Sequence, residues 1–158
     1  MNAKGFEGLK VWQLAHELML IIHKQIVPKL PADETWDLAS QIRRSSKSVG
    51  ANIAEGYGRY YYQDNARFCY NARGSLDETI NHLCDALDLG YIHPDLCRLA
   101  REKADHTRRA LNGYIGYLKQ KKIGDDEPGA HVSPYPCLSL RQPTPPTSRR
   151  PSNSNSCP

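Results

Sequence analysis

Apolar side chains recur every three or four residues from Val11 to Leu118, and this periodicity constrains the fold more than any other feature of the chain. Such spacing places apolar residues along one face of an α-helix. No segment alternates apolar and polar residues over the length of a strand. Proline or glycine interrupts the pattern between successive apolar stripes, so the sequence predicts four amphipathic helices.

The limits of these helices follow from capping and helix-terminating residues. Pro28 stops the first helix, and Asp33 is a suitable N-cap for the second. Asp64 is the expected cap of the third helix, Gly90 ends it, and Pro94 suits the first turn of the fourth. We therefore expect helices over residues 9–27, from Asp33 to Gly56 or Gly58, from Asp64 to Gly90 and from Pro94 to Gly124.

Short connections between helices of similar length favour antiparallel neighbours, so the predicted fold is all-α: an up-down-up-down four-helix bundle over residues 1–123. Residues 124–158 differ in composition, because they are rich in proline, serine and threonine and poor in apolar residues. Such a segment cannot form a helix ladder or a core of its own. We expect it to be a disordered Pro/Ser-rich C-terminal tail.

The charge and size of the chain set broad limits on its function. The 158 residues correspond to one domain, and 39% of them are hydrophobic, which is enough for a modest core. There are 21 Lys+Arg against 17 Asp+Glu, a formal net charge of +4. The tail holds three of each sign, so the whole excess lies in residues 1–123. A mildly basic domain is compatible with an acidic partner such as a nucleic acid without requiring one.

Targeting signals and a disulfide framework are both missing from the sequence. The apolar runs are far shorter than the ~18 residues of a membrane span, and the N-terminus lacks the layout of a secretory signal. The five cysteines include no C-x-x-C pair, so we expect reduced thiols. These features predict a cytoplasmic protein without membrane contact.

Small and polar side chains on the second and third helices suggest a polar seam between them. If the turn is centred near Tyr60, Ser45 lies level with Ser75, and Arg43 or Arg44 lies level with Glu78. We expect an interhelical ion pair that fixes the register of the two helices. The alternative is that these residues are ordinary solvated side chains.

A basic patch on the second helix is the best candidate for a binding site. Arginine beside exposed tyrosine can bind phosphates and stack on unpaired bases, and tyrosines cluster at residues 57–62. The alternative is a solvated charged face with the tyrosines packed against a neighbouring subunit. The candidate nucleic-acid-binding residues are Arg43, Arg44, Lys47, Arg59, Arg67 and Arg73.

The sequence contains no complete catalytic motif. His16-Glu17 begins like a zinc-protease motif, but the second histidine position is occupied by Leu20. Gly56 and Gly58 lack the third glycine and the preceding strand of a dinucleotide loop. The E-x-x-H pairs of di-iron bundles are also missing. The sequence therefore predicts no enzyme activity, no catalytic or metal-binding residues and no cofactor.

Three segments resemble the four-helix-bundle family of 23S rRNA intervening-sequence proteins over about residues 6–120. They are FEGLKVWQLA at Phe6–Ala15, QIRRSSKSVGANIAEGYGR at Gln41–Arg59, and ARGSLDE at Ala72–Glu78. The resemblance implies a homopentamer. A related accessory protein of diversity-generating retroelements is pentameric and contacts nucleic acid and a reverse transcriptase, which the resemblance makes expected partners here. The structural positions that match the family pattern include Asn52, Glu55, Gly56, Phe68, Ser75 and Glu78.

Two hypotheses about function follow. The first is a non-enzymatic oligomer that binds nucleic acid, preferably RNA, or acts as an accessory scaffold. The second is a structural or protein–protein interaction oligomer with no nucleic-acid role.

Overall fold

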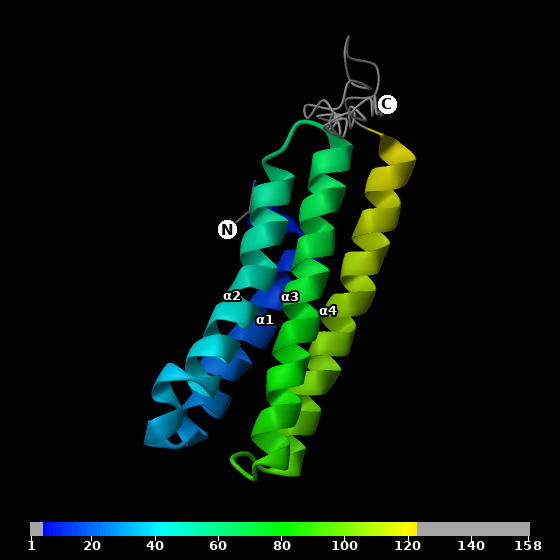
Figure 1. Cartoon of the computed structure of the whole chain (residues 1–158). Helices are drawn as coiled ribbons and strands as arrows, with labels where there is room; N and C mark the ends of the chain where they lie inside the picture. The colour runs from blue at the N-terminus through cyan, green and yellow to red at the C-terminus, as the bar shows by residue number, and fades with distance from the viewer. Residues whose placement is uncertain (1–4, 123–158) are drawn as a thin grey trace, which may run out of the picture.

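The computed structural model describes residues 5–122, which form four long helices: α1 (Lys10–Ile21), α2 (Leu38–Tyr57), α3 (Tyr62–Asp88) and α4 (Pro94–Lys121). Successive helices run in opposite directions, and the chain turns at alternate ends of the bundle (Figure 1). No strand occurs among the described residues. The predicted all-α antiparallel bundle is therefore confirmed. The predicted tail and the expected helix end at Gly124 lie outside the described residues.

The four helices close into a ring around one core. Each helix packs against its neighbours in the chain, and α1 also packs against α4. Burying a large apolar side chain contributes about 1.5–3 kcal/mol, so the continuous stripe along each helix holds the ring together. The apolar residues that recur at this spacing and are fully or almost fully buried include Val11, Leu18, Ile22, Ile42, Val49, Ile53, Leu76, Leu83, Leu111 and Ile115.

The first helix ends differently from the sequence-based expectation. Its regular α-helical part stops at Ile21, and the chain continues through a π-turn at Ile22–Ile26 and a 3-10 turn at Val27–Lys29. A π-turn holds an extra residue, which changes the phase of the helix. Ile22, Ile26 and Val27 are all buried on the approach to Pro28.

The predicted cap of the second helix is wrong. Asp33 lies in a 3-10 turn at Ala32–Trp36, and α2 begins only at Leu38. The Leu38 backbone N–H donates a hydrogen bond to Glu34 Oε2 at 3.2 Å. The Glu34 carboxylate thus accepts a hydrogen bond from a backbone N–H at the start of α2, as the side chain of an N-cap residue would otherwise do.

The predicted ends of α3 and the predicted start of α4 are wrong at one position and correct at two. The third helix begins at Tyr62, so Asp64 lies in its first turn, where a carboxylate suits the helix dipole, and does not cap it. Gly90 follows this helix with φ of 73°, a conformation that favours glycine. Pro94 opens α4 as predicted, and the preceding His93 accepts a hydrogen bond from the Asp95 backbone N–H at 3.3 Å.

None of the helices within residues 5–122 combines the length and the apolar character needed to cross a membrane.

Candidate nucleic-acid interface

A polar seam joins α2 to α3, and its register is set by hydroxyl groups. Ser48 Oγ lies 2.9 Å from Ser75 Oγ, and Thr79 Oγ1 lies 3.0 Å from Ser45 Oγ. Ser45 is therefore level with Thr79 and not with Ser75, one helical turn from the predicted pairing. These two pairings place the centre of the antiparallel register one to two residues beyond Tyr60.

The expected ion pair across this seam is formed by Arg44 and Glu78, whose Nη2 and Oε1 atoms lie 3.6 Å apart. The side chain of Arg44 is 76% exposed and that of Glu78 is 42% exposed. An exposed pair of this kind adds little stability. Most of the Arg44 guanidinium therefore stays accessible to a ligand.

Several family-pattern residues make contacts inside the bundle. Asn52 Nδ2 donates to the Ser48 carbonyl at 2.8 Å and lies 3.0 Å from Ser48 Oγ. Gly56 is buried, and a Cβ placed on it would lie 2.9 Å from Asn65 Oδ1 and 3.0 Å from Phe68 Cβ. Glycine here lets α2 and α3 approach each other closely.

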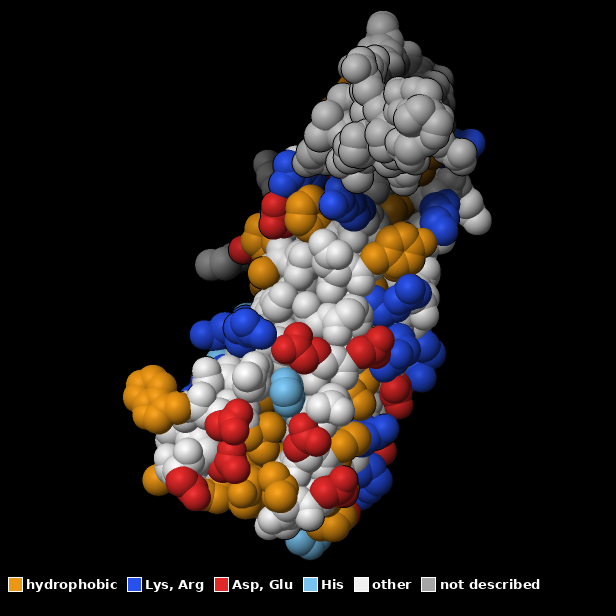
Figure 2. Space-filling model, in the orientation of Figure 1, with side chains coloured by type: hydrophobic (Ala, Val, Ile, Leu, Met, Phe, Trp, Pro, Cys, Tyr) orange, Lys and Arg blue, Asp and Glu red, His pale blue; other side chains and the backbone are white. Residues whose placement is uncertain are grey.

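The outward face of α2 carries the basic surface, which we define as Arg43, Arg44 and Lys47. Figure 2 shows lysine and arginine side chains gathered on this edge of the molecule. The three side chains line an open depression of about 480 Å³. Its other lining residues are Thr35, Trp36 and Ser40.

Trp36 is the functional candidate that the sequence analysis missed. Its side chain is 91% exposed, the highest value among the large hydrophobic residues of the described chain. It ends the 3-10 turn at Ala32–Trp36, whereas the neighbouring Leu38 and Ala39 point into the core. The available signal was a tryptophan outside the apolar stripe, just before a basic helix.

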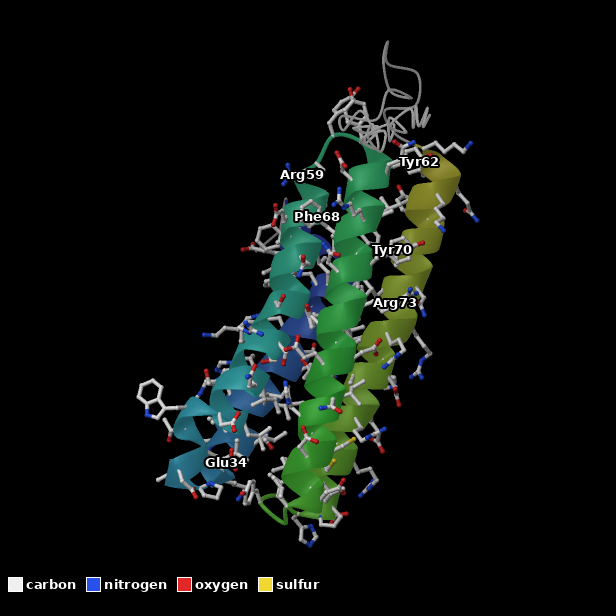
Figure 3. All side chains as sticks on the ribbon, in the orientation of Figure 1. Glu34, Arg59, Tyr62, Phe68, Tyr70 and Arg73 are labelled. Carbon is white, nitrogen blue, oxygen red and sulfur yellow. The ribbon has the colours of Figure 1, made fainter. Side chains whose placement is uncertain are left out.

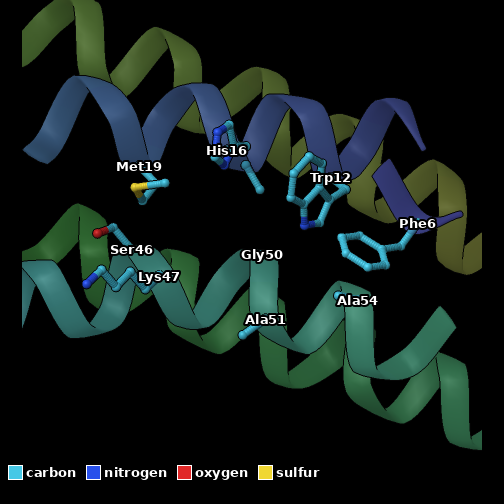
Figure 4. Close-up of a pocket in the computed structure, with 10 residues that line it drawn as sticks. Phe6, Trp12, His16, Met19, Ser46, Lys47, Gly50, Ala51 and Ala54 are labelled. Carbon is cyan, nitrogen blue, oxygen red and sulfur yellow. The ribbon is translucent and has the colours of Figure 1, made fainter. Parts of the chain in front are cut away.

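A second hollow lies on the other side of Lys47, between α1 and α2 (Figure 4). Its volume is about 280 Å³. Trp12 stacks on His16 with ring centres 4.9 Å apart, and Phe6 meets the indole edge-on at 5.2 Å. Small residues of α2 form the opposite wall: Ser46, Gly50, Ala51 and Ala54. Lys47 therefore stands between two hollows that each contain a tryptophan.

Behind the basic surface, His23 lies on the π-turn that follows α1, near Lys47 and the backbone of Arg43. Burial, followed by the positive charge of Lys47, lowers the pKa of His23, and a hydrogen bond to the Arg43 backbone partly opposes this shift. Its Nε2 atom is buried without a hydrogen-bond partner in the described chain. Near neutral pH the histidine adds no charge, so the positive potential comes from the three cations in front of it.

The remaining candidate cations do not join this surface. Arg59 donates to Glu55 Oε1 at 2.6 Å and covers the ring of Phe68 at 4.9 Å. Figure 3 places Arg59 and Phe68 near the end of α2, and Tyr70 and Arg73 further along α3 beside α4.

Arg73 covers the Tyr70 ring at 5.0 Å and donates to Asn112 Oδ1 on α4 at 3.4 Å. Arg67 is exposed on α3. Three of the six predicted binding residues therefore share one depression. The other three lie elsewhere on the bundle, two of them in contacts that support packing between or within helices.

The predicted tyrosine cluster lies at the end of the bundle where α2 meets α3. Tyr57, Tyr60 and Tyr62 share a pocket there with Tyr114 and Tyr117 of α4. Lys47 is ten residues before Tyr57 on α2, about 15 Å along the helix. The tyrosines therefore lie away from the basic surface, and Arg59 is the one candidate cation of the six that lines their pocket.

The fold and this surface define a four-helix-bundle protein with a compact basic face flanked by two indoles. Residues 7–113 match the sequence pattern of the 23S rRNA-intervening sequence proteins, and the chain belongs to that family. No curated protein sequence matches the chain. Within residues 5–122, no three histidine, cysteine, aspartate or glutamate side chains are grouped so that they could hold a metal ion.

Proposed function

We propose that this chain is a non-enzymatic RNA-binding protein that acts as an oligomer and holds RNA on the basic surface of α2. One observation supports this most directly: the highly exposed Trp36 shares a depression with Arg43, Arg44 and Lys47. The family to which the chain belongs takes its name from ribosomal RNA, which makes RNA the first nucleic acid to test.

The chemistry of this depression suits single-stranded RNA. Lysine and arginine side chains contact phosphates, and an exposed indole offers a face on which an unpaired base stacks. Bases in a duplex are already stacked on their neighbours, so Trp36 can stack only on an unpaired base. We therefore expect the protein to bind single strands more tightly than duplex RNA of the same length.

Substitution of the cations tests the role of charge. In Arg44→Ala/Lys47→Ala, we expect weaker binding of a fluorescent single-stranded RNA, measured by anisotropy over a series of salt concentrations. The slope of log affinity against log salt should decrease in magnitude by about 1.4, because two phosphate contacts are lost. Arg98→Ala/Arg109→Ala removes two exposed cations of α4 and should leave the slope unchanged. Parental affinity in the α2 variant would remove the basic surface from this proposal.

Substitution of Trp36 tests the role of stacking. Trp36→Ala should weaken binding of single-stranded RNA by about 1–3 kcal/mol and leave the salt slope unchanged. The side chain is almost wholly exposed, so the stability of the bundle should not change. Equal loss on single-stranded and duplex RNA would argue against base stacking.

The second candidate is a structural oligomer without a nucleic-acid role, and the 91% exposure of the Trp36 side chain favours it. The family resemblance suggests a homopentamer, so Trp36 could lie between subunits. Light scattering of Trp36→Ala distinguishes the two candidates. A smaller assembly with unchanged RNA affinity supports the structural role, whereas an unchanged mass with lost affinity supports RNA binding. A reverse transcriptase as partner and a cytoplasmic location stay predictions.

A further inference from the structure

Five tyrosines line a pocket at one end of the bundle, which we name the tyrosine pocket. Its volume is about 260 Å³. Figure 3 shows Arg59 and Tyr62 at this end, close to where the chain leaves α4. The lining residues are Leu9, Tyr57, Arg59, Tyr60, Tyr62, Asn65, Tyr114, Tyr117 and Leu118.

The pocket is firmly built on one side and open on the other. Asn65 Nδ2 donates to the Tyr114 hydroxyl at 3.2 Å, and burial raises the pKa of Tyr114. Tyr57 and Tyr117 remain 43% and 49% exposed. A fixed inner wall with half-exposed rings at the opening is suited to an apolar segment that enters from outside.

The sequence that follows α4 fits this pocket in both charge and composition. We propose that the tyrosine pocket binds residues 125–137 of the same chain. The pocket residues Tyr117 and Leu118 lie four to five residues before Lys122, the last described residue, so the proposed segment is tethered at the edge of the pocket.

The first part of the segment is acidic and is complementary in charge to the end of α4. Asp125, Asp126 and Glu127 are consecutive, and they are all the acidic residues that follow α4. They come directly after a helix end that carries Lys119, Lys121 and Lys122. Opposite charges at this end steer the segment toward the bundle and away from other acidic surfaces.

The second part of the segment contains the sequence Pro134-Tyr135-Pro136, whose composition suits an aromatic pocket. Proline rings in an extended polyproline helix pack well on grooves lined by aromatic side chains, and they lose little entropy on binding. Pro134 is twelve positions after Lys122, a reach of up to about 40 Å when extended, so the geometry allows binding within one chain. A short tether also gives an effective concentration in the millimolar range, so weak contacts are enough.

Cys137 directly follows Pro136 and allows a direct test on the full-length chain. A nitroxide spin label on Cys137 in Cys84→Ser/Cys157→Ser should broaden the amide signals of residues 57–62 and 117–118. The buried thiols of Cys69 and Cys97 remain unlabelled. Signals near Gly90, at the opposite end of the bundle, should stay sharp.

Two pairs of variants separate binding from tethering. Pro134→Ala/Pro136→Ala should restore the broadened signals, whereas Pro145→Ala/Pro146→Ala should not. Tyr117→Ala should also restore them, whereas Tyr70→Ala should not, because Tyr70 is similarly exposed but lies outside the pocket. If broadening survives both Pro134→Ala/Pro136→Ala and Tyr117→Ala, tethering alone explains it and the proposal fails.

A mixed sample identifies the chain that supplies the segment. Spin label and ¹⁵N are placed on different molecules, which are then combined. Intramolecular binding predicts sharp signals in this mixture. Broadening as strong as in the sample whose molecules carry both the spin label and ¹⁵N would mean that a second copy supplies the segment. That result would overturn the proposal. The test involves no RNA, so its outcome is independent of the function proposed for α2.

Discussion

Two glycines show how differently the same residue acts in two helices. Gly56 is buried in α2, and its neighbours Asn65 and Phe68 on α3 leave no room for a methyl group. Gly74 lies in the interior of α3 on an exposed face, and a Cβ there would meet nothing within 4 Å. Glycine is therefore required at the first position by close packing, whereas at the second it only weakens the helix.

The two positions should respond to alanine in opposite ways. Gly56→Ala should destabilise the protein by about 1–3 kcal/mol, because the backbone carbonyl of Asn65 at 3.1 Å cannot move aside as a side chain can. Gly74→Ala should stabilise it by about 0.5–1 kcal/mol through helix propensity alone. Urea unfolding followed by circular dichroism measures both changes. A Gly56→Ala protein as stable as the parent would show that the helices are packed less closely.

At the scale of helices, the contact between α2 and α3 combines an apolar stripe with a fully buried hydroxyl pair. Ser45 and Thr79 are 1% and 0% exposed. The Thr79 hydroxyl also lies 2.8 Å from the Ser75 carbonyl, so it has a partner within its own helix. Ser45 similarly lies 3.3 Å from the Ile42 carbonyl. Each hydroxyl thus has a hydrogen-bond partner in its own helix, and the hydrogen bond between Ser45 and Thr79 fixes the register of the two helices.

A double-mutant cycle tests this pair. Thr79→Val should destabilise the protein by about 0.5–1.5 kcal/mol, the net contribution of one hydrogen bond, because the Ser45 hydroxyl keeps its bond to the Ile42 carbonyl. Ser45→Ala/Thr79→Val should be no less stable than Thr79→Val alone, because both polar groups are then gone. Thr107→Val is the matched control, because Thr107 is equally buried but bonds only the Lys103 carbonyl of its own helix, at 2.9 Å. An additive cycle would show that the two hydroxyls do not interact.

At the scale of the whole molecule, the ring of helices is closed by the contact between α1 and α4. Lys103 Nζ on α4 lies 2.7 Å from Glu17 Oε2 on α1. The hydrogen bond from Lys103, followed by its positive charge, lowers the pKa of Glu17 below its ordinary value of 4.5. These two residues are 86 positions apart, and their pairing depends on the complete fold.

The lowered pKa sets the sign of a pH dependence. Above pH 4.5 the carboxylate is ionised in both the folded and the unfolded state, and the pair stabilises the fold. As the pH falls through the lower pKa of the folded state, this contribution is lost. Lys103→Gln should therefore destabilise the protein by about 0.2–1 kcal/mol at pH 7 and by less at pH 3. Arg109→Gln on the same helix should show a smaller pH-dependent change, and high salt should reduce the Lys103 effect.

Much of the fold could be predicted from the chain because helix periodicity is local. The stripe residues Ile42, Val49 and Ile53 are buried as their spacing predicts. The ion pair between Arg44 and Glu78 could also be predicted, since a short turn between two helices fixes which residues lie level. The helix ends were harder to predict, because Asp33 and Asp64 both resemble caps, and only the packed chain shows where each helix begins.

The candidate site could be predicted only in part. Arg43, Arg44 and Lys47 lie within five residues of one helix, so their shared face follows from helix geometry. Arg59 and Arg73 appeared equally available, yet each covers an aromatic ring in the folded chain. Which cations serve packing depends on the neighbours that the fold brings to them, and sequence spacing does not encode those neighbours.

The sequence alone determined the number of helices, the face that each one buries and the cluster of positive charge on α2, because these depend on residues three or four positions apart. Only the tertiary structure decided that Trp36 stays outside the core beside that charge, that Trp12 lies on the other side of Lys47, and that tyrosines from α2, α3 and α4 form one pocket. The reason is physical: these arrangements join segments far apart in the chain, and their geometry is set by how the helices pack.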